Sequence, residues 1–231
     1  MLQHRNVVVL FLTFVLAVAS CRNKDVSHLG PAAPDVSVLA TEMSNLMIHD
    51  VTNPPLAARF FAYAFLAGYE VVSQNDSSMI SMHGILNDYP KIAKPNVEHY
   101  SPKIASVLAV IRTASKIQPS GKDLQKLEED LLKKYREQGF DDEVIAGSAI
   151  YADSVAKEIL KYAKADNYNK LSDLPRYQPV KGDGYWYPTP PAFLPIVEPH
   201  FNKVRSFTMD SANIYKPLPP VAFDTSKSSP F

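Results

Sequence analysis

The sequence predicts an all-α protein, a bundle of about five helices followed by an ordered extended segment rich in proline and aromatic residues. Three observations predict it. Apolar residues recur at helical spacing over residues 35–165, no alternating strand pattern interrupts them, and eleven of the 19 prolines follow Asp166. We therefore divide the chain into residues 1–20, 21–34, 35–165 and 166–231.

Composition narrows the class of protein. The 231 residues carry 24 basic and 24 acidic side chains, so there is no positive excess to neutralise phosphates, and nucleic acid is excluded as the expected partner. A hydrophobic fraction of 46% is typical of a globular chain. A single cysteine excludes a disulfide framework.

The first 20 residues are predicted to be an export signal. Residues 7–19 form an apolar run that is too short to span a membrane but suits a signal-peptide core. The run leads through Val18, Ala19 and Ser20 to Cys21, and this resembles the lipobox of bacterial lipoproteins. The resemblance implies cleavage before Cys21, acylation of that residue, a tether over residues 21–34 and attachment to a membrane of the bacterial cell envelope, outside the cytoplasm. The alternative is an ordinary secretory signal with an incidental cysteine.

Polar caps and prolines mark the starts of the first three helices. Asp35 is predicted to cap the first helix. Asn53 is predicted to cap the second, with two prolines in a first turn that needs no N–H groups. After a loop over residues 73–100, Ser101-Pro102 repeats this start. Small residues alternate with large ones in the second helix, so we expect it at the centre of the bundle.

Two further helices complete the predicted bundle. Pro119 and Ser120 are expected to open an exposed helix that Gly139 ends. Asp141 is predicted to cap the last helix, which continues to about Ala165. The exposed helix has an apolar stripe of Leu124, Leu127, Leu131 and Tyr135.

Residues 166–231 differ from the bundle in their proline density, which no helix interior or central strand accepts. Their many aromatic residues are atypical of a disordered linker. We expect an extended wrap laid across the bundle, with Tyr185, Trp186 and Tyr187 as a packing anchor rather than a cofactor platform.

Several short patterns imitate known sites. The six histidines lack zinc-site spacing. Ser154-Val155-Ala156-Lys157 matches an acylation motif but is expected on a helix surface without its companion motifs. Pro119-Ser120-Gly121-Lys122 lacks the first glycine of a phosphate loop. His49-Asp50 is expected to be a structural pair at a helix end, because no nucleophile elbow accompanies it.

Two stretches carry a resemblance to a family. The first runs from His49 to Arg59 and continues with Tyr63 and Ala67-Gly68-Tyr69-Glu70. The second runs from Trp186 to Phe193 and on through Glu198-Pro199 and Arg205-Ser206-Phe207 to Pro220, with Asp166-Asn167-Tyr168 and Pro175-Arg176-Tyr177 between the two. Together they resemble bacterial vanadium-dependent haloperoxidase-related proteins of the type 2 phosphatidic acid phosphatase superfamily.

The resemblance implies an N-terminal helical half followed by a catalytic half that holds an oxyanion, with halide oxidation or phosphomonoester hydrolysis as the family activity. The family's Arg-Pro and Ser-Gly-His motifs are absent from residues 1–231. No catalytic, cofactor-binding or metal-binding residue is therefore transferred to this chain, and vanadate is expected only with a C-terminal catalytic half.

We expect the N-terminal half of a longer protein, because the chain stops where the resemblance places the next helix. Its expected partners are a membrane through acylated Cys21, and a catalytic half or a second copy of itself. The alternative is a stand-alone binding lipoprotein for a nutrient or a partner domain.

Overall fold

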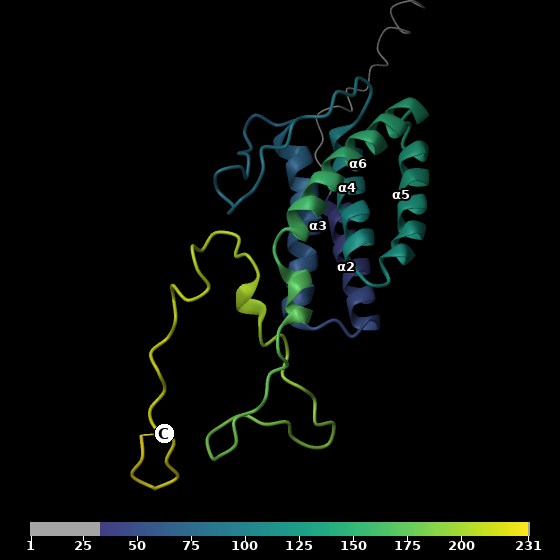
Figure 1. Cartoon of the computed structure of the whole chain (residues 1–231). Helices are drawn as coiled ribbons and strands as arrows, with labels where there is room; N and C mark the ends of the chain where they lie inside the picture. Colours follow the sequence, from purple (N-terminus) through teal and green to yellow (C-terminus); the bar gives the residue numbers. More distant parts are fainter. Residues whose placement is uncertain (1–32, 231) are drawn as a thin grey trace, which may run out of the picture.

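The computed structural model describes residues 33–230, whose regular structure is helical. Its α-helices are α2 (Ala33–His49), α3 (Pro54–Ser73), α4 (Pro102–Ile117), α5 (Gln125–Glu137) and α6 (Asp142–Lys164). Short 3₁₀ helices cover Gly121–Leu124, Tyr168–Asp173 and Phe201–Lys203. The five α-helices lie side by side, and the C-terminal segment leaves from one end of the bundle (Figure 1). The predicted all-α class is confirmed.

Helix α3 begins as its sequence predicts. The Asn53 side chain accepts a hydrogen bond from the N–H of Leu56 at 3.0 Å, and prolines occupy the first turn. The helix is long and apolar enough to cross a membrane. Burial in the bundle also explains why this helix is apolar. Its residues Tyr63, Ala64, Ala67 and Val71 are each at most 1% exposed. The expectation that this helix is the central one is wrong, because α4 is the helix that packs against each of the other four.

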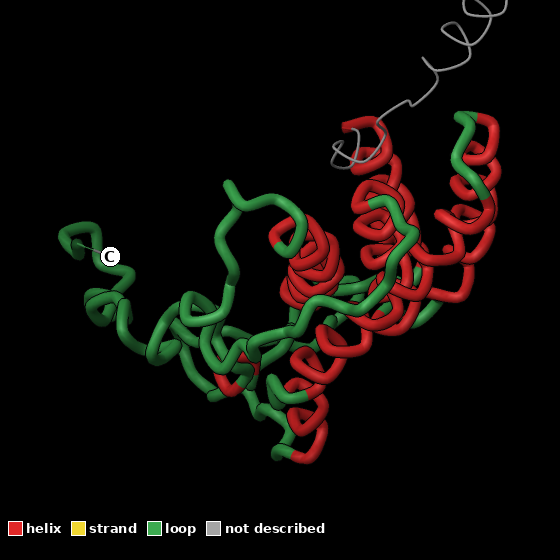
Figure 2. The backbone as a smooth tube through the Cα atoms, turned by 90° about the horizontal axis from the view of Figure 1, so that it is seen from above, coloured by secondary structure: helices red, strands yellow, loops and turns green. Residues whose placement is uncertain are grey.

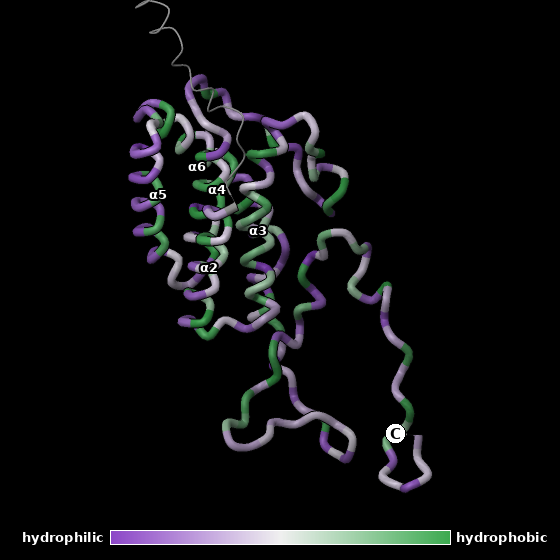
Figure 3. Tube along the Cα trace, turned by 180° about the vertical axis from the view of Figure 1, so that it is seen from behind, coloured by the Kyte–Doolittle hydropathy of each residue, from purple (hydrophilic) through white to green (hydrophobic). Residues whose placement is uncertain are grey.

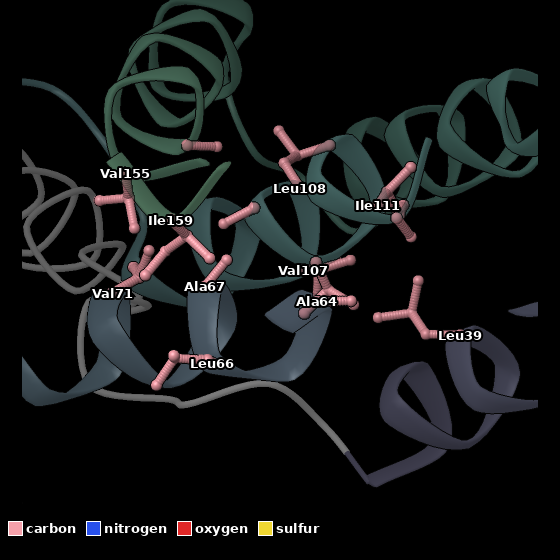
Figure 4. Packing of buried hydrophobic residues seen from close by; sticks show 14 of the residues in the cluster. Leu39, Ala64, Leu66, Ala67, Val71, Val107, Leu108, Ile111, Val155 and Ile159 are labelled. Atoms are coloured by element: carbon pink, nitrogen blue, oxygen red, sulfur yellow. The ribbon is translucent and has the colours of Figure 1, made fainter. Parts of the chain in front are cut away.

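The core lies where α3, α4 and α6 meet. Figure 4 shows Ala64 of α3 next to Val107 of α4. A Cβ atom at Gly68 would stand 2.7 Å from Cγ2 of Val110, so this glycine allows α3 and α4 to approach. Burying a side chain such as Leu108 stabilises the fold by about 1.5–3 kcal/mol.

Asp35 does not cap the first helix, because α2 already begins at Ala33. Its side chain is 1% exposed and receives the Lys134 ammonium at 2.5 Å and the Tyr135 hydroxyl at 3.2 Å, both from α5. A carboxylate can be buried here because a cation and a phenol satisfy it. Asp35 therefore joins α2 to α5 instead of starting α2.

Two other predicted caps have the right position without the predicted bond. Ser101 and Asp141 stand at the N-caps of α4 and α6, but neither side chain caps its helix. The Ser101 N–H instead donates to Oγ of Ser148 at 2.9 Å. Ser120 precedes a 3₁₀ turn that leads into α5, and its hydroxyl donates to Asp50 at 2.6 Å. At Ser120 the hydroxyl therefore makes a tertiary contact and does not cap a helix.

The C-terminal segment has three parts, which we name by their residues. The first arm is 177–197, the return segment is 198–207 and the second arm is 209–223. The return segment contacts the bundle, whereas both arms extend beyond it (Figures 1 and 2). The expectation of a wrap across the bundle is therefore wrong for the arms. Their prolines prevent a helix or paired strands, so the arms have no backbone ladder that could hold them on the helices.

Candidate functional site

The return segment is fixed to the bundle by a polar cluster, which we call the junction. At its centre Arg59 of α3 donates from Nε to Oδ2 of Asp166 at 2.6 Å and from Nη2 to Oδ1 at 3.2 Å. Asp166 lies just after α6, and its side chain is 1% exposed. Two-point contact between guanidinium and carboxylate fixes both orientation and distance. The junction thus ties the start of α3 to the end of α6.

Tyrosines extend the junction on both sides of this ion pair. The Tyr63 hydroxyl donates to Oδ2 of Asp166 at 3.0 Å. The Arg59 guanidinium carbon stands 5.1 Å from the Tyr63 ring centroid and 4.8 Å from that of Tyr168. The Tyr168 hydroxyl donates to Oε1 of Glu198 at 2.8 Å, and the Asn53 amide donates to the same oxygen at 2.9 Å. The residue that caps α3 therefore also holds the return segment.

Arg205 attaches the return segment to α6. Its N–H donates to the Asp166 carbonyl at 2.9 Å, and its Nη2 donates to the Tyr162 carbonyl at 3.0 Å. Its guanidinium carbon lies 3.7 Å from the centroid of the Tyr162 ring. Two residues later, the Phe207 carbonyl accepts from the N–H of Asn87 at 2.7 Å. The segment is thus held by charge, stacking and backbone bonds together.

The junction tyrosines are protonated at neutral pH. Burial raises the pKa of Tyr63 above its ordinary value, and the charge of Asp166 raises it further. Burial and the hydrogen bond to Glu198 raise the pKa of Tyr168 to about 12. The phenols therefore act as hydrogen-bond donors to carboxylates, not as anions.

Next to the junction is a pocket of about 740 Å³, between the 3₁₀ helix Tyr168–Asp173 and the two ends of the first arm. Rings of Tyr177, Trp186 and several prolines line it, together with Arg176 and His200. His200 donates from Nε2 to the Pro175 carbonyl at 2.7 Å, because a carbonyl can only accept. The pocket is apolar with a few polar groups, as small-molecule sites usually are.

Most of the exposed large hydrophobic residues lie in the arms. Of the 21 large hydrophobic residues that are exposed within residues 33–230, 14 lie between Tyr177 and Phe223. Tyr185, Trp186 and Tyr187 are 56%, 46% and 63% exposed, so they are not the packing anchor that we predicted. Hydrophobic stretches occur along both arms, away from the bundle (Figure 3). Exposed hydrophobic residues that gather in one region often mark an interaction surface.

Residues that carried the family resemblance meet at the junction. Arg59 and Tyr63 come from the first stretch, Glu198 and Arg205 come from the second, and Asp166 lies between the two. Composition and periodicity gave no reason to pair residues 107 positions apart. The resemblance was the one signal in the sequence that selected them.

Two of the short patterns that imitate known sites have polar side chains bonded to other groups of the protein. Asp50 accepts from the Ser120 N–H at 3.0 Å and from its hydroxyl at 2.6 Å, with His49 at 3.1 Å. These hydrogen bonds, those of Ser120 first, hold the pKa of Asp50 below its ordinary value. The predicted structural pair at the end of α2 is therefore present. Ser154 and Lys157 are exposed on α6, and the Ser154 hydroxyl donates to the Ile150 carbonyl at 3.0 Å.

The described residues do not fit vanadate. An oxyanion site needs several cationic donors that converge around an imidazole. Arg59, Arg112 and Arg136 each pair with carboxylates, and Arg205 stacks on a tyrosine. In residues 33–230 no group of three His, Cys, Asp or Glu residues could hold a metal ion. Cys21, the predicted lipid-attachment site, lies outside the described residues.

Comparison with known proteins supports the class that the fold defines. No family model matches the sequence, and no curated protein matches it either. Among solved structures, the crystal structure of a bacterial vanadium-dependent iodoperoxidase is similar, with a TM-score of 0.80 and 30% sequence identity. The match covers 88% of this chain. The chain therefore has a haloperoxidase-like fold, in support of the superfamily that the sequence indicated.

The same match covers 48% of the iodoperoxidase chain. This chain thus spans about half the length of that protein.

Proposed function

We propose that this chain is the exported, lipid-anchored helical half of a haloperoxidase-like protein, and that it is inactive alone. In this proposal a separate catalytic helical half binds to the arms. One observation carries it, namely the exposed aromatic surface of residues 177–223 on a chain that covers 48% of an iodoperoxidase. Monomeric proteins rarely expose contiguous apolar patches of more than a few hundred Å².

The junction is suited to support such an interface. It fixes both ends of the first arm, because Tyr168 and Glu198 bond to each other across the arm's base at 2.8 Å. At the far end, a Cβ atom on Gly184 would come within 2.7 Å of the Phe223 ring, so the second arm lies close to the first. Arms that are held in position lose less conformational entropy on binding than flexible ones.

Binding of a catalytic half gives a direct test. We expect the part of the iodoperoxidase chain that this chain does not cover, produced separately, to bind the purified chain. Trp186→Ala with Tyr187→Ala should weaken binding about tenfold or more, since truncating central aromatic residues typically costs 2 kcal/mol or more. Ile150→Ala is a matched control, because Ile150 is 58% exposed on α6. Equal loss of binding in the control would contradict an interface on the arms.

Activity tests the other part of the proposal. The isolated chain, given vanadate, hydrogen peroxide and iodide or bromide, should oxidise no halide, and given a phosphomonoester it should release no phosphate. The reason is that Arg59, Arg112 and Arg136 are held by carboxylates, so residues 33–230 offer no set of several cations that converges on an imidazole. Turnover by the chain alone would refute the proposal.

Self-association of the isolated chain through the uncovered arms is also expected, and analytical sedimentation measures it.

Anchoring is proposed from the lipobox resemblance alone. Cys21→Ala should move the protein from the membrane fraction to the soluble fraction of a bacterial host and abolish labelling by a fatty-acid analogue. Ser27→Ala in the tether is the matched control and should stay membrane-bound. Membrane retention of the Cys21 variant would contradict lipid anchoring.

The pocket favours a second function, that of a stand-alone binding lipoprotein. Its 740 Å³ lies within the usual range of ligand sites, and Arg176 offers a cation beside flat rings. An aromatic carboxylate fits these groups. Trp186 is the only tryptophan in the chain, so its fluorescence reports occupancy of the pocket. Saturable quenching that Arg176→Gln weakens would support this function, and no quenching would count against it.

A further inference from the structure

Three tyrosine rings form a series of ring contacts that runs inward from the junction. The ring centroids of Tyr63 and Tyr162 are 5.8 Å apart, and those of Tyr162 and Tyr89 are 5.0 Å apart. At its outer end the series reaches Tyr168 through Arg59, which stands over both the Tyr63 and Tyr168 rings. Tyr168 lines the same pocket as Trp186. The series thus runs from the base of the first arm to the buried Tyr89, in the loop between α3 and α4.

The inner end of this series has a built-in proton acceptor. The Tyr89 hydroxyl donates to Oε2 of Glu70 at 2.8 Å, and both residues are at most 3% exposed. Gln74 donates to the other oxygen of Glu70 at 2.8 Å. Both donors are neutral, so a proton taken up by Glu70 breaks no ion pair. At Tyr63 a proton taken up by Asp166 would break the ion pair with Arg59.

The exposed tyrosines of the arms differ in this respect. Tyr177, Tyr185 and Tyr215 are 40%, 56% and 80% exposed, and water is their proton acceptor. Burial raises the pKa of Tyr89, so its phenol is protonated at neutral pH and must lose a proton when it loses an electron. A carboxylate already at hydrogen-bond distance is the geometry that such a proton transfer needs.

We propose that Tyr168, Tyr63, Tyr162 and Tyr89 form a relay that carries one-electron oxidation from Trp186 of the first arm to the Tyr89–Glu70 pair. The oxidant is a one-electron radical oxidant, such as a peroxyl or halogen-centred radical, and it is reduced to its anion. One electron leaves Tyr89 along the relay, its phenolic O–H bond breaks, and a new O–H bond forms on Glu70. The products are a neutral tyrosyl radical and a neutral carboxylic acid.

The relay depends on the geometry of this chain and not on the proposed function. When an oxidising radical removes an electron from the arms, the relay moves the resulting radical to Tyr89, which is buried away from solvent. This protects the exposed tyrosines of the arms from cross-linking. If the chain does serve a peroxide-consuming partner, radicals of this class are expected close to the arms.

Pulse radiolysis of the purified full chain with azide tests the relay. The azide radical oxidises tryptophan preferentially, and Trp186 is the only one. The arm tyrosines are first replaced, by Tyr→Phe at positions 177, 185, 187 and 215, so that they cannot accept the radical. We expect the tryptophanyl absorption to decay as a long-lived tyrosyl absorption rises, at a rate independent of protein concentration.

Two variants in that background locate the path and its end. Tyr63→Phe interrupts the relay after Tyr168, and Tyr89→Phe removes its last member, so each should abolish the long-lived tyrosyl signal. Tyr135→Phe is the matched control, because Tyr135 is equally buried and donates to Asp35 at 3.2 Å, but its aromatic neighbour is Phe140. Circular dichroism checks that each variant is folded.

The proposal is overturned if Tyr63→Phe and Tyr89→Phe behave like Tyr135→Phe, or if the conversion rate is proportional to protein concentration. Either result leaves the proposed function untouched, because no halide oxidation or partner binding is measured.

Discussion

The bundle and the arms are both rich in aromatic residues, but they use them in opposite ways. In the bundle Tyr63, Tyr135 and Tyr151 are at most 1% exposed, and each hydroxyl donates to a polar side chain. In the arms Tyr187 and Tyr215 are 63% and 80% exposed. Helices bury aromatic residues because a second helix covers them, whereas proline-rich arms have no second layer of their own. Similar side chains are therefore core in one region and uncovered surface in the other.

The junction connects the two regions, and breaking it should have the largest effect. Asp166→Ala leaves Arg59 partly buried without its carboxylate and removes the acceptor of Tyr63. Loss of one partner of a buried ion pair typically destabilises by about 3–5 kcal/mol. Urea unfolding followed by circular dichroism measures this.

Asp142→Ala is the control for that experiment, because its ion pair with Arg136 is exposed at both residues. It should cost less than about 1 kcal/mol. Equal effects of the two variants would mean that the junction does not join the arms to the bundle energetically.

A matched pair of leucines sharpens the comparison. Leu108 of α4 is fully buried, and Leu218 of the second arm is 90% exposed. Leu108→Ala should lower the free energy of unfolding by about 2–5 kcal/mol, since it leaves a cavity. Leu218→Ala should change it by less than about 0.5 kcal/mol. A large effect at Leu218 would show that the second arm is packed in solution and would remove the contrast.

Two helix starts test how the bundle is capped. Asn53→Ala should cost about 1 kcal/mol by the lost cap alone, and it also removes a bond to Glu198 in the return segment. Ser101→Ala should be nearly neutral, because no group in residues 33–230 bonds to its buried hydroxyl. Thermal unfolding measures both. A larger loss at Ser101 than at Asn53 would contradict this ranking.

The smallest expected effect is on the pH dependence of stability, and it comes from Asp50 in the bundle. Asp50 has a lowered pKa, so its contribution is complete above the ordinary aspartate pKa of about 3.9 and is lost as pH falls through the lower folded value. Asp50→Asn should therefore show a weaker fall in stability over that acidic range. His49→Ala should keep most of the fall, because Ser120 is the main cause of the shift. An unchanged pH profile in Asp50→Asn would contradict the assignment.

Local signals predicted the fold well where the side chain and its partner are near in sequence. The Asn53 cap followed by two prolines started α3, and Gly139, with φ of 91°, followed the end of α5. Asp35 is not the predicted cap, and Ser120 does not cap the helix that it was expected to open, for one reason. Their oxygens bond across the bundle, to α5 and to the end of α2, and sequence spacing carries no record of such contacts.

The candidate site was less predictable. Arg59 and Asp166 are 107 residues apart, and Glu198 reaches Asn53 across 145 residues. A family resemblance selected several of these residues but gave no reason for them to meet. The position of the arms was also mispredicted, because an aromatic residue can pack equally well on its own bundle or on another chain.

The sequence by itself determined the helical class, the order of the helices, the absence of the family's oxyanion motifs within residues 1–231 and the change of composition after Asp166. These follow from periodicity, local caps and backbone restrictions, which act over a few residues. Only the tertiary structure decided that Arg59, Asp166 and Arg205 form one junction and that the arms remain exposed. Burial and ion pairing depend on which surfaces the folded helices bring together, and that is a property of the whole chain.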